Sequence, residues 1–168
     1  MTYEQVRGSN WMNQINNNFA LVEPLLGGAA GLGVLRVARY LFDTAGDDAN
    51  GVSNKTAAAH PTGVVLPAHA IVVGGFFDVN TVFTSAANTA QIAIHVVAAN
   101  DVQTAAAVSG APYSTIGRKA IVPKANTPES TSLKTTVDSA ITLTVSVQAL
   151  TAGKLTGYLY YVEGIASA

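Results

Sequence analysis

Three histidines, His60, His69 and His95, are the side chains of this 168-residue chain best suited to acid–base or metal chemistry, because imidazole titrates near neutral pH and binds metal ions. Their spacings match no metal-binding pair, such as two histidines four residues apart on a helix. We expect His60 in a long polar loop, His69 in a turn and His95 in the middle of a strand. The pattern therefore predicts single histidines, exposed or on a polar face, and no metal ligand.

Acidic side chains gather in that expected loop, which spans residues 43–62. The residues with carboxylate or amide side chains at its start are Asp43, Asp47, Asp48 and Asn50. An EF-hand calcium loop would require an acidic residue at Gly46 and a glutamate at Ala57, and the chain has neither. Two interpretations stay open, a loop whose carboxylates hold a cation and a solvated loop, and the glycines of the segment favour the second.

Nucleophilic and cofactor-dependent catalysis finds no support in the sequence. The chain has no cysteine, so it offers neither a thiol nucleophile nor a thiolate ligand. Ser109 lacks the preceding glycine of a nucleophile elbow, and no glycine motif for dinucleotides or phosphates occurs. The glutamates lie far apart in the chain: Glu4, Glu23, Glu129 and Glu163. We therefore predict a protein that is not an enzyme, with no catalytic residue and no cofactor.

Residues 10–23 have the pattern of an amphipathic helix, which Ser9 or Asn10 caps and Pro24 ends. Its apolar side chains recur at spacings of three and four, so they fall on one face. They are Trp11, Met12, Ile15, Phe19 and Val22. These are the predicted partner-binding residues. They would either dock on another chain or pack against the domain that follows, and the sequence favours neither alternative.

A glycine-rich connector follows the expected helix. Residues 27–33 have the sequence Gly-Gly-Ala-Ala-Gly-Leu-Gly, which is typical of a flexible linker. The predicted domains are therefore an N-terminal helical arm with its connector at residues 1–33 and a β domain at residues 34–168.

The remainder of the chain has the alternating pattern of β-strands. Strands are expected at 34–42, 63–66, 70–83, 91–98, 102–108, 116–122, 133–137, 141–149 and 155–162. The last two are expected to form a hairpin around a turn at 151–154. About eight short strands with one buried face predict a mainly β protein, an antiparallel β-sandwich. An eight-stranded jelly roll is the first choice, and an immunoglobulin-like sandwich is the alternative.

The last expected strand carries three tyrosines. Alternation places Tyr158 and Tyr160 on one face of the strand and Tyr161 on the other. The set is either a contact surface for protein or sugar, or a core aromatic with amphipathic edges. The pattern favours the second interpretation.

The composition indicates a surface with few charges. Charged residues make up 11% of the chain, against about 25% in ordinary domains. The net charge of −1 provides no electrostatic basis for binding nucleic acid. The fairly apolar stretch at residues 20–37 is interrupted by Glu23, Pro24 and four glycines, so no membrane segment is expected. A surface with so few charges is typical of a protein that partners cover.

Two stretches of the chain resemble a known family, the capsid decoration (cement) proteins of tailed bacteriophages. One is the pattern Val-Leu-Pro-Ala-x-Ala-Ile-Val-x-Gly-Gly-Phe at residues 65–76, followed by Thr-Val-Phe-Thr-Ser-Ala at 81–86. The other is Val-Gln-Ala-Leu-Thr-Ala-Gly-Lys-Leu at residues 147–155, which precedes an aromatic strand. The resemblance covers about residues 34–163 and does not include the expected arm.

The resemblance implies a virion protein on the outer surface of the capsid. It implies a sandwich or jelly roll that forms a homo-oligomer, expected to be a trimer, and that bridges subunits of the major capsid protein. The alternative is a virion protein that binds a receptor or glycan, such as a head fibre or tail component. In that case the loops at 43–62 and 123–130 would form the binding site.

Overall fold

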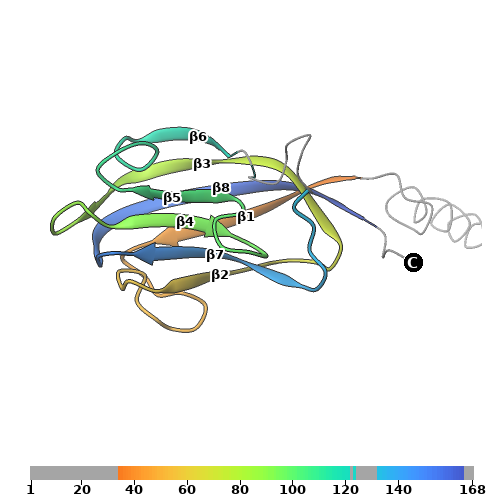
Figure 1. The fold of residues 1–168 in the computed structure, drawn as a ribbon, viewed down its shortest axis with the longest axis horizontal. Coiled ribbons are helices and arrows are strands. Elements are labelled where there is room, and N and C mark those ends of the chain that lie inside the picture. The colour runs from red at the N-terminus through yellow and green to blue at the C-terminus, as the bar shows by residue number, and fades with distance from the viewer. Residues whose placement is uncertain (1–33, 122, 124–131, 165–168) are drawn as a thin grey trace, which may run out of the picture. The chain divides into compact units, whose positions relative to one another are not determined.

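The computed structural model describes residues 34–121, 123 and 132–164. Its eight strands are β1 (Leu35–Asp43), β2 (Ala59–Leu66), β3 (Ala70–Ser85), β4 (Gln91–His95), β5 (Gln103–Ala107), β6 (Gly117–Ile121), β7 (Ser139–Ser146) and β8 (Leu150–Glu163). They form two four-stranded sheets, in the orders β1-β8-β3-β6 and β2-β7-β4-β5, and neighbouring strands are antiparallel (Figure 1). The predicted mainly β class is confirmed. The predicted helix at 10–23 and the domain boundary at residue 33 lie outside the described residues.

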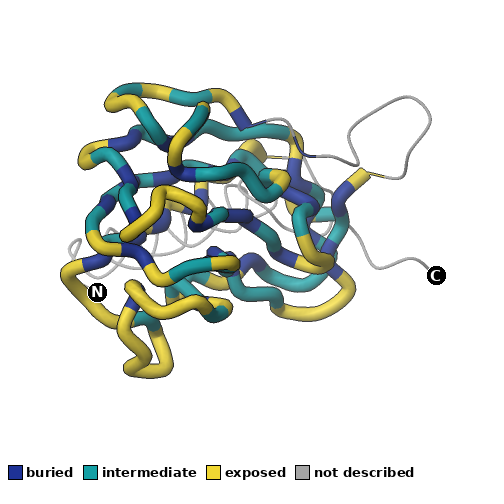
Figure 2. Tube along the Cα trace, turned by 60° about the vertical axis from the view of Figure 1, so that its left-hand side comes forward, coloured by how far each residue is buried: buried dark blue, intermediate teal, exposed yellow. Residues whose placement is uncertain are grey.

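Alternating apolar residues place one face of each sheet in a shared core. In β7, Ile141, Leu143 and Val145 are buried, while the threonines between them are half-buried. Buried side chains of both sheets belong to one continuous cluster, so the two sheets pack as a sandwich (Figure 2). In β4, Ile92 and Ile94 are fully buried.

The predicted C-terminal hairpin is wrong. β7 pairs with β2 and β4, whereas β8 pairs with β1 and β3 in the other sheet. The chain leaves β7 at Val147, which has a φ of 71° and is 69% exposed, and then crosses to the other sheet. Alternation identifies the buried face of a strand but not its partner, and both connections leave the same pattern.

Gly153 lies within β8, although the sequence predicts a turn there. A Cβ atom at this position would lie 2.0 Å from Cδ1 of Phe83. The glycine therefore leaves room for the Phe83 ring in the core, and it does not mark a chain reversal.

Two further expectations are corrected. The predicted loop at 43–62 ends early, because β2 begins at Ala59. The predicted strand at 133–137 is only an isolated bridge between Lys134 and Ile71. The β-branched run Thr135-Thr136-Val137 favours a strand by propensity, but tertiary packing overrides that preference.

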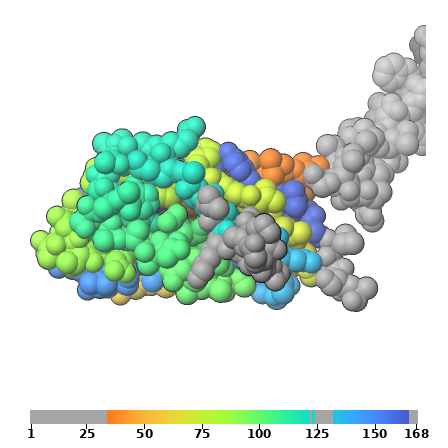
Figure 3. Space-filling view, turned by 45° about the horizontal axis from the view of Figure 1, so that its top comes forward, coloured from red at the N-terminus to blue at the C-terminus, as the bar shows by residue number. Residues whose placement is uncertain are grey.

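Two core tyrosines have hydroxyl groups without a hydrogen-bond partner among the described residues, Tyr40 and Tyr113. Burial raises the pKa of both phenols. Tyr113 comes from the connection between β5 and β6, whose surface is green to teal in Figure 3. Its ring lies 5.8 Å from that of Phe77 and 5.6 Å from that of Phe83.

We expect Tyr113→Phe to keep these ring contacts and to raise the free energy of unfolding by about 1 kcal/mol, because it removes a buried hydroxyl that makes no hydrogen bond. Urea unfolding of the variant and the parent chain would measure the difference. A clear loss of stability would mean that the hydroxyl has a partner, such as a buried water molecule.

Candidate functional site

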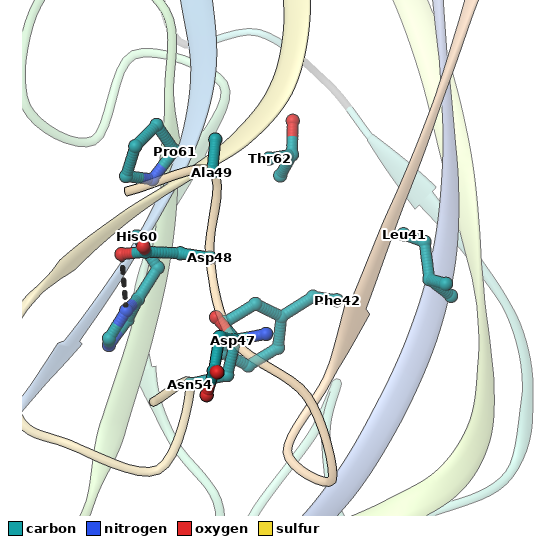
Figure 4. A pocket seen from close by; sticks show the side chains of 9 residues that line it. All are labelled: Leu41, Phe42, Asp47, Asp48, Ala49, Asn54, His60, Pro61 and Thr62. Carbon is teal, nitrogen blue, oxygen red and sulfur yellow. Dashed lines mark hydrogen bonds and ion pairs between the residues drawn. The ribbon is translucent and has the colours of Figure 1, made fainter. Parts of the chain in front are cut away.

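His60 and Asp48 form a buried pair at the edge of the sandwich. The Nδ1 atom of His60 lies 3.1 Å from Oδ2 of Asp48, and the two side chains are 0% and 1% exposed (Figure 4). The Nε2 atom lies 2.9 Å from the carbonyl oxygen of Thr56. Which of the two ring nitrogens donates depends on the tautomer of His60. The prediction of an exposed or polar-face His60 in a loop is therefore wrong.

Asp48 organises the loop between β1 and β2. Its Oδ1 atom accepts hydrogen bonds from the amides of Asn50 and Val52, at 2.8 and 2.9 Å. The Val52 amide, the Asn50 amide and the His60 ring lower the pKa of this carboxyl, and burial acts in the opposite direction. Asp48 therefore holds the loop through hydrogen bonds to both of its carboxylate oxygens.

A small pocket of about 40 Å³ opens beside this pair (Figure 4). The side chain of Asn54 lines it; its Nδ2 donates to the carbonyl of Asp43 at 3.0 Å, and its Oδ1 is buried without a partner in the described part of the chain. Such a volume holds only one or a few water molecules. Among residues 34–121, 123 and 132–164, no three acidic or histidine side chains converge on a metal position.

The other histidines are placed apart from this pocket. His69 lies in the turn before β3, as predicted, with a φ of 65°. His95 ends β4, rather than lying in its middle, and its Nδ1 is 3.4 Å from Oγ1 of Thr144. Neither histidine lines the pocket beside His60 and Asp48.

The outer face of the sheet β1-β8-β3-β6 is the most unusual surface of the described domain. We call it the aromatic face and define it by Leu35, Val37, Leu41, Phe76, Tyr158 and Tyr160. On β1 the exposed residues alternate with the buried Ala38, Tyr40 and Phe42. Leu35, Val37 and Leu41 are 56%, 53% and 48% exposed. The strand therefore presents branched apolar side chains to solvent along most of its length.

The backbone register groups the aromatic rings of this face. Val37 lies opposite Tyr160, and Phe76 lies opposite Tyr158. The rings of Phe76 and Tyr158 stack with centroids 4.7 Å apart, and the Tyr160 ring lies 6.0 Å from Phe76. Tyr161 packs against the core instead. The predicted division of the three tyrosines is confirmed, but Tyr158 and Tyr160 are surface residues and not core aromatics.

Two arginines flank the ring stack. Arg118 of β6 places its Cζ atom 4.3 Å from the centroid of the Phe76 ring, a cation–π distance. Its Nε and Nη2 atoms each lie 3.2 Å from an oxygen of Asp78. Arg39 of β1 lies opposite Tyr158 on the other side, and it forms no ion pair with any described residue. The face therefore combines aliphatic side chains with aromatic and guanidinium groups, and the aromatic and guanidinium groups are enriched in protein interfaces.

The outer face of the second sheet differs in chemistry. Its β7 side chains are small and polar, namely Thr142, Thr144 and Ser146, and all three are half-buried. The predicted partner-binding residues of the N-terminal segment, Trp11, Met12, Ile15, Phe19 and Val22, lie outside the described residues. No helix among the described residues is long and apolar enough to cross a membrane.

No family model matches the chain, and no curated protein sequence matches it. Three chains in solved phage structures are similar in fold. One is from the capsid asymmetric unit of cyanophage Pam1, with a TM-score of 0.55 and 20% identity over 80% of this chain and 89% of that one. The second, from the capsid of Ralstonia phage GP4, has a TM-score of 0.54 and 16% identity over 80% and 87%.

The third is from an acid-stable capsid structure of the Helicobacter pylori bacteriophage KHP30, with a TM-score of 0.51 and 13% identity over 77% of this chain and 87% of that one. At these identities the likeness is one of fold, and it extends over most of the length of each chain.

Proposed function

We propose that this chain is a non-enzymatic structural protein of a bacteriophage virion. It decorates the outer surface of the capsid and stabilises it by bridging subunits of the major capsid protein. The observation that carries the proposal is the likeness in fold to chains of three phage capsid structures, over about four-fifths of this chain. The resemblance of residues 65–76 and 147–155 to decoration proteins points in the same direction.

The proposal includes a jelly roll as the form of the sandwich. The pairs β1–β8, β2–β7, β3–β6 and β4–β5 are all antiparallel. They join the first strand to the last, the second to the next to last, and so on inward. Rolling up one long two-stranded ribbon produces this nested pairing, so the strand order supports an eight-stranded jelly roll, a fold used by viral capsid domains.

Cementing requires contact area and no active site. A protein that binds only the assembled shell stabilises that shell by mass action, and several linked contacts strengthen the effect. The exposed side chains of the aromatic face suit such a contact. A homotrimer would multiply the contacts, and residues 1–33 would serve as an additional arm.

Heating shells with and without this protein tests the function. We expect shells that lack it to rupture at a lower temperature, and we expect the purified full-length chain to restore the rupture temperature when added back. A matched add-back with a chain that lacks residues 1–33 measures the contribution of the arm. Equal rupture temperatures with and without the protein would contradict cementing and favour a role in binding the host surface.

A further inference from the structure

We propose that the aromatic face binds a polypeptide other than a second copy of this chain, and that this partner presents an apolar surface with a carboxylate opposite Arg39. The proposal rests on the proposed function in one respect, because it locates the partner in the capsid. It adds which face of the domain makes the contact and which chemical group the partner must supply.

The first argument is the exposure of the face. Leu35, Val37 and Leu41 are about half exposed on one strand, beside the stacked rings of Phe76 and Tyr158. Arg39 lies between Val37 and Leu41 on this strand, so the face is apolar with one cation within it, and grouped exposed apolar side chains of this kind mark sites of protein interaction. Tyrosine and arginine are also the residues that most often dominate binding energy in interfaces.

The second argument is the charge balance of the face and its margins. Three carboxylates lie there, and each already has a cationic partner. The ion pairs are Lys154–Asp43 at 2.9 Å, Arg118–Asp78 at 3.2 Å and Arg36–Glu163 at 3.0 Å. Arg39 is the exception, since it has no ion pair within the described ranges. A face-to-face contact between two copies would therefore bring Arg39 no free carboxylate from the described residues of this face.

The third argument is the cost of covering Arg39. It lies opposite Tyr158 and within the row of side chains that includes Phe76. A partner that covers these rings also removes water from the guanidinium, and an unpaired buried charge opposes binding. A carboxylate on the partner removes this cost, because it forms two parallel hydrogen bonds with the guanidinium group of Arg39.

Co-sedimentation with shells that lack this protein tests the proposal. The full-length parent chain should bind. Arg39→Glu should bind at least about 30-fold more weakly, as expected when one side of a covered charge pair is lost. Arg39→Lys should fall between the two, because lysine keeps the charge but not the fork. The matched control is Thr104→Glu, which places the same charge on an exposed residue of β5 in the other sheet.

The two possible failures are distinguishable. If the parent chain binds shells and Arg39→Glu binds equally well, the surface is not the contact and the proposal is overturned, while the proposed function stands. If the parent chain does not bind, the proposed function fails and the proposal fails with it. Thermal unfolding should be the same for all four proteins, because the substituted side chains are exposed.

A photo-crosslinking residue in place of Tyr160 identifies the occupant. Tyr160 lies on the aromatic face and is half-buried, next to the ring of Phe76. Irradiation of decorated shells should join the chain to a capsid polypeptide of different mass. A crosslink between two copies of this chain would overturn the proposal and assign the face to self-association.

Discussion

The Gly157→Ala variant is expected to lose about 3 kcal/mol of its free energy of unfolding, the upper part of the range for overpacked cores. Gly157 lies on the central strand β8, opposite Tyr40 of β1. A Cβ atom there would lie 2.0 Å from Cζ of Tyr40 and 2.4 Å from its hydroxyl oxygen. The ring cannot turn away easily, because Tyr40 is only 1% exposed. The loss is large against a total stability of about 5–15 kcal/mol for a typical domain.

Gly74→Ala is the matched control. Gly74 lies on the neighbouring strand β3, and a Cβ atom there would meet nothing within 4 Å. This substitution should be neutral or slightly stabilising, because alanine reduces the entropy of the unfolded chain by about 0.4–1 kcal/mol. Urea unfolding of both variants measures the two effects. Similar losses in both would show that the strand backbone, and not the Tyr40 ring, is sensitive to the change.

Local patterns were sufficient to predict most of the strands. The alternation of Ile141, Leu143 and Val145 with threonines identifies β7 and its inward side. Such patterns depend only on the two-residue period of an extended chain, which every strand shares. The all-β class follows from them without knowledge of the partners of any strand.

Strand pairing could not be predicted in the same way. β7 and β8 are adjacent in sequence, and their alternation would suit a hairpin, yet they lie in different sheets. The difference arises at Val147, where a positive φ turns the chain toward the other sheet. Gly153 misled the prediction because glycine serves both turns and close ring contacts, and only the position of Phe83 distinguishes the two.

The candidate surface was accessible to sequence analysis only in part. Alternation correctly places Tyr158 and Tyr160 on one face, but it cannot tell which face of a central strand meets solvent. The exposed face of β8 is determined by the strands on either side of it. β1 places Val37 beside Tyr160, and β3 places Phe76 beside Tyr158. The burial of His60 was missed because its partner Asp48 comes from a separate loop and leaves no periodic signal.

Loss of the His60–Asp48 pair is the second change expected to lower the free energy of unfolding strongly. We expect His60→Leu to destabilise the domain by about 3 kcal/mol, because it leaves the buried Oδ2 atom of Asp48 without its hydrogen-bond partner. It also leaves the carbonyl oxygen of Thr56 without its donor. His95→Leu is the control, since His95 is half-buried and makes only a 3.4 Å contact with Thr144. Similar losses in the two variants would contradict a special role for the buried pair.

The pH dependence of stability provides an independent measurement of this pair. The Val52 and Asn50 amides and the His60 ring lower the pKa of Asp48 below its ordinary value of 3.8. A carboxyl whose pKa is lower in the folded state stabilises that state at pH values above the ordinary pKa, and this contribution disappears as the pH falls through the lowered pKa.

The melting temperature should therefore fall in acid, and Asp48→Asn should weaken that dependence while also lowering stability at neutral pH. The exposed neighbour Asp47 has no side-chain hydrogen bond or ion pair in the described ranges, so Asp47→Asn should leave the profile unchanged. An unaltered acid profile in Asp48→Asn would show that other carboxylates, such as Asp43 beside Lys154, determine the response to acid.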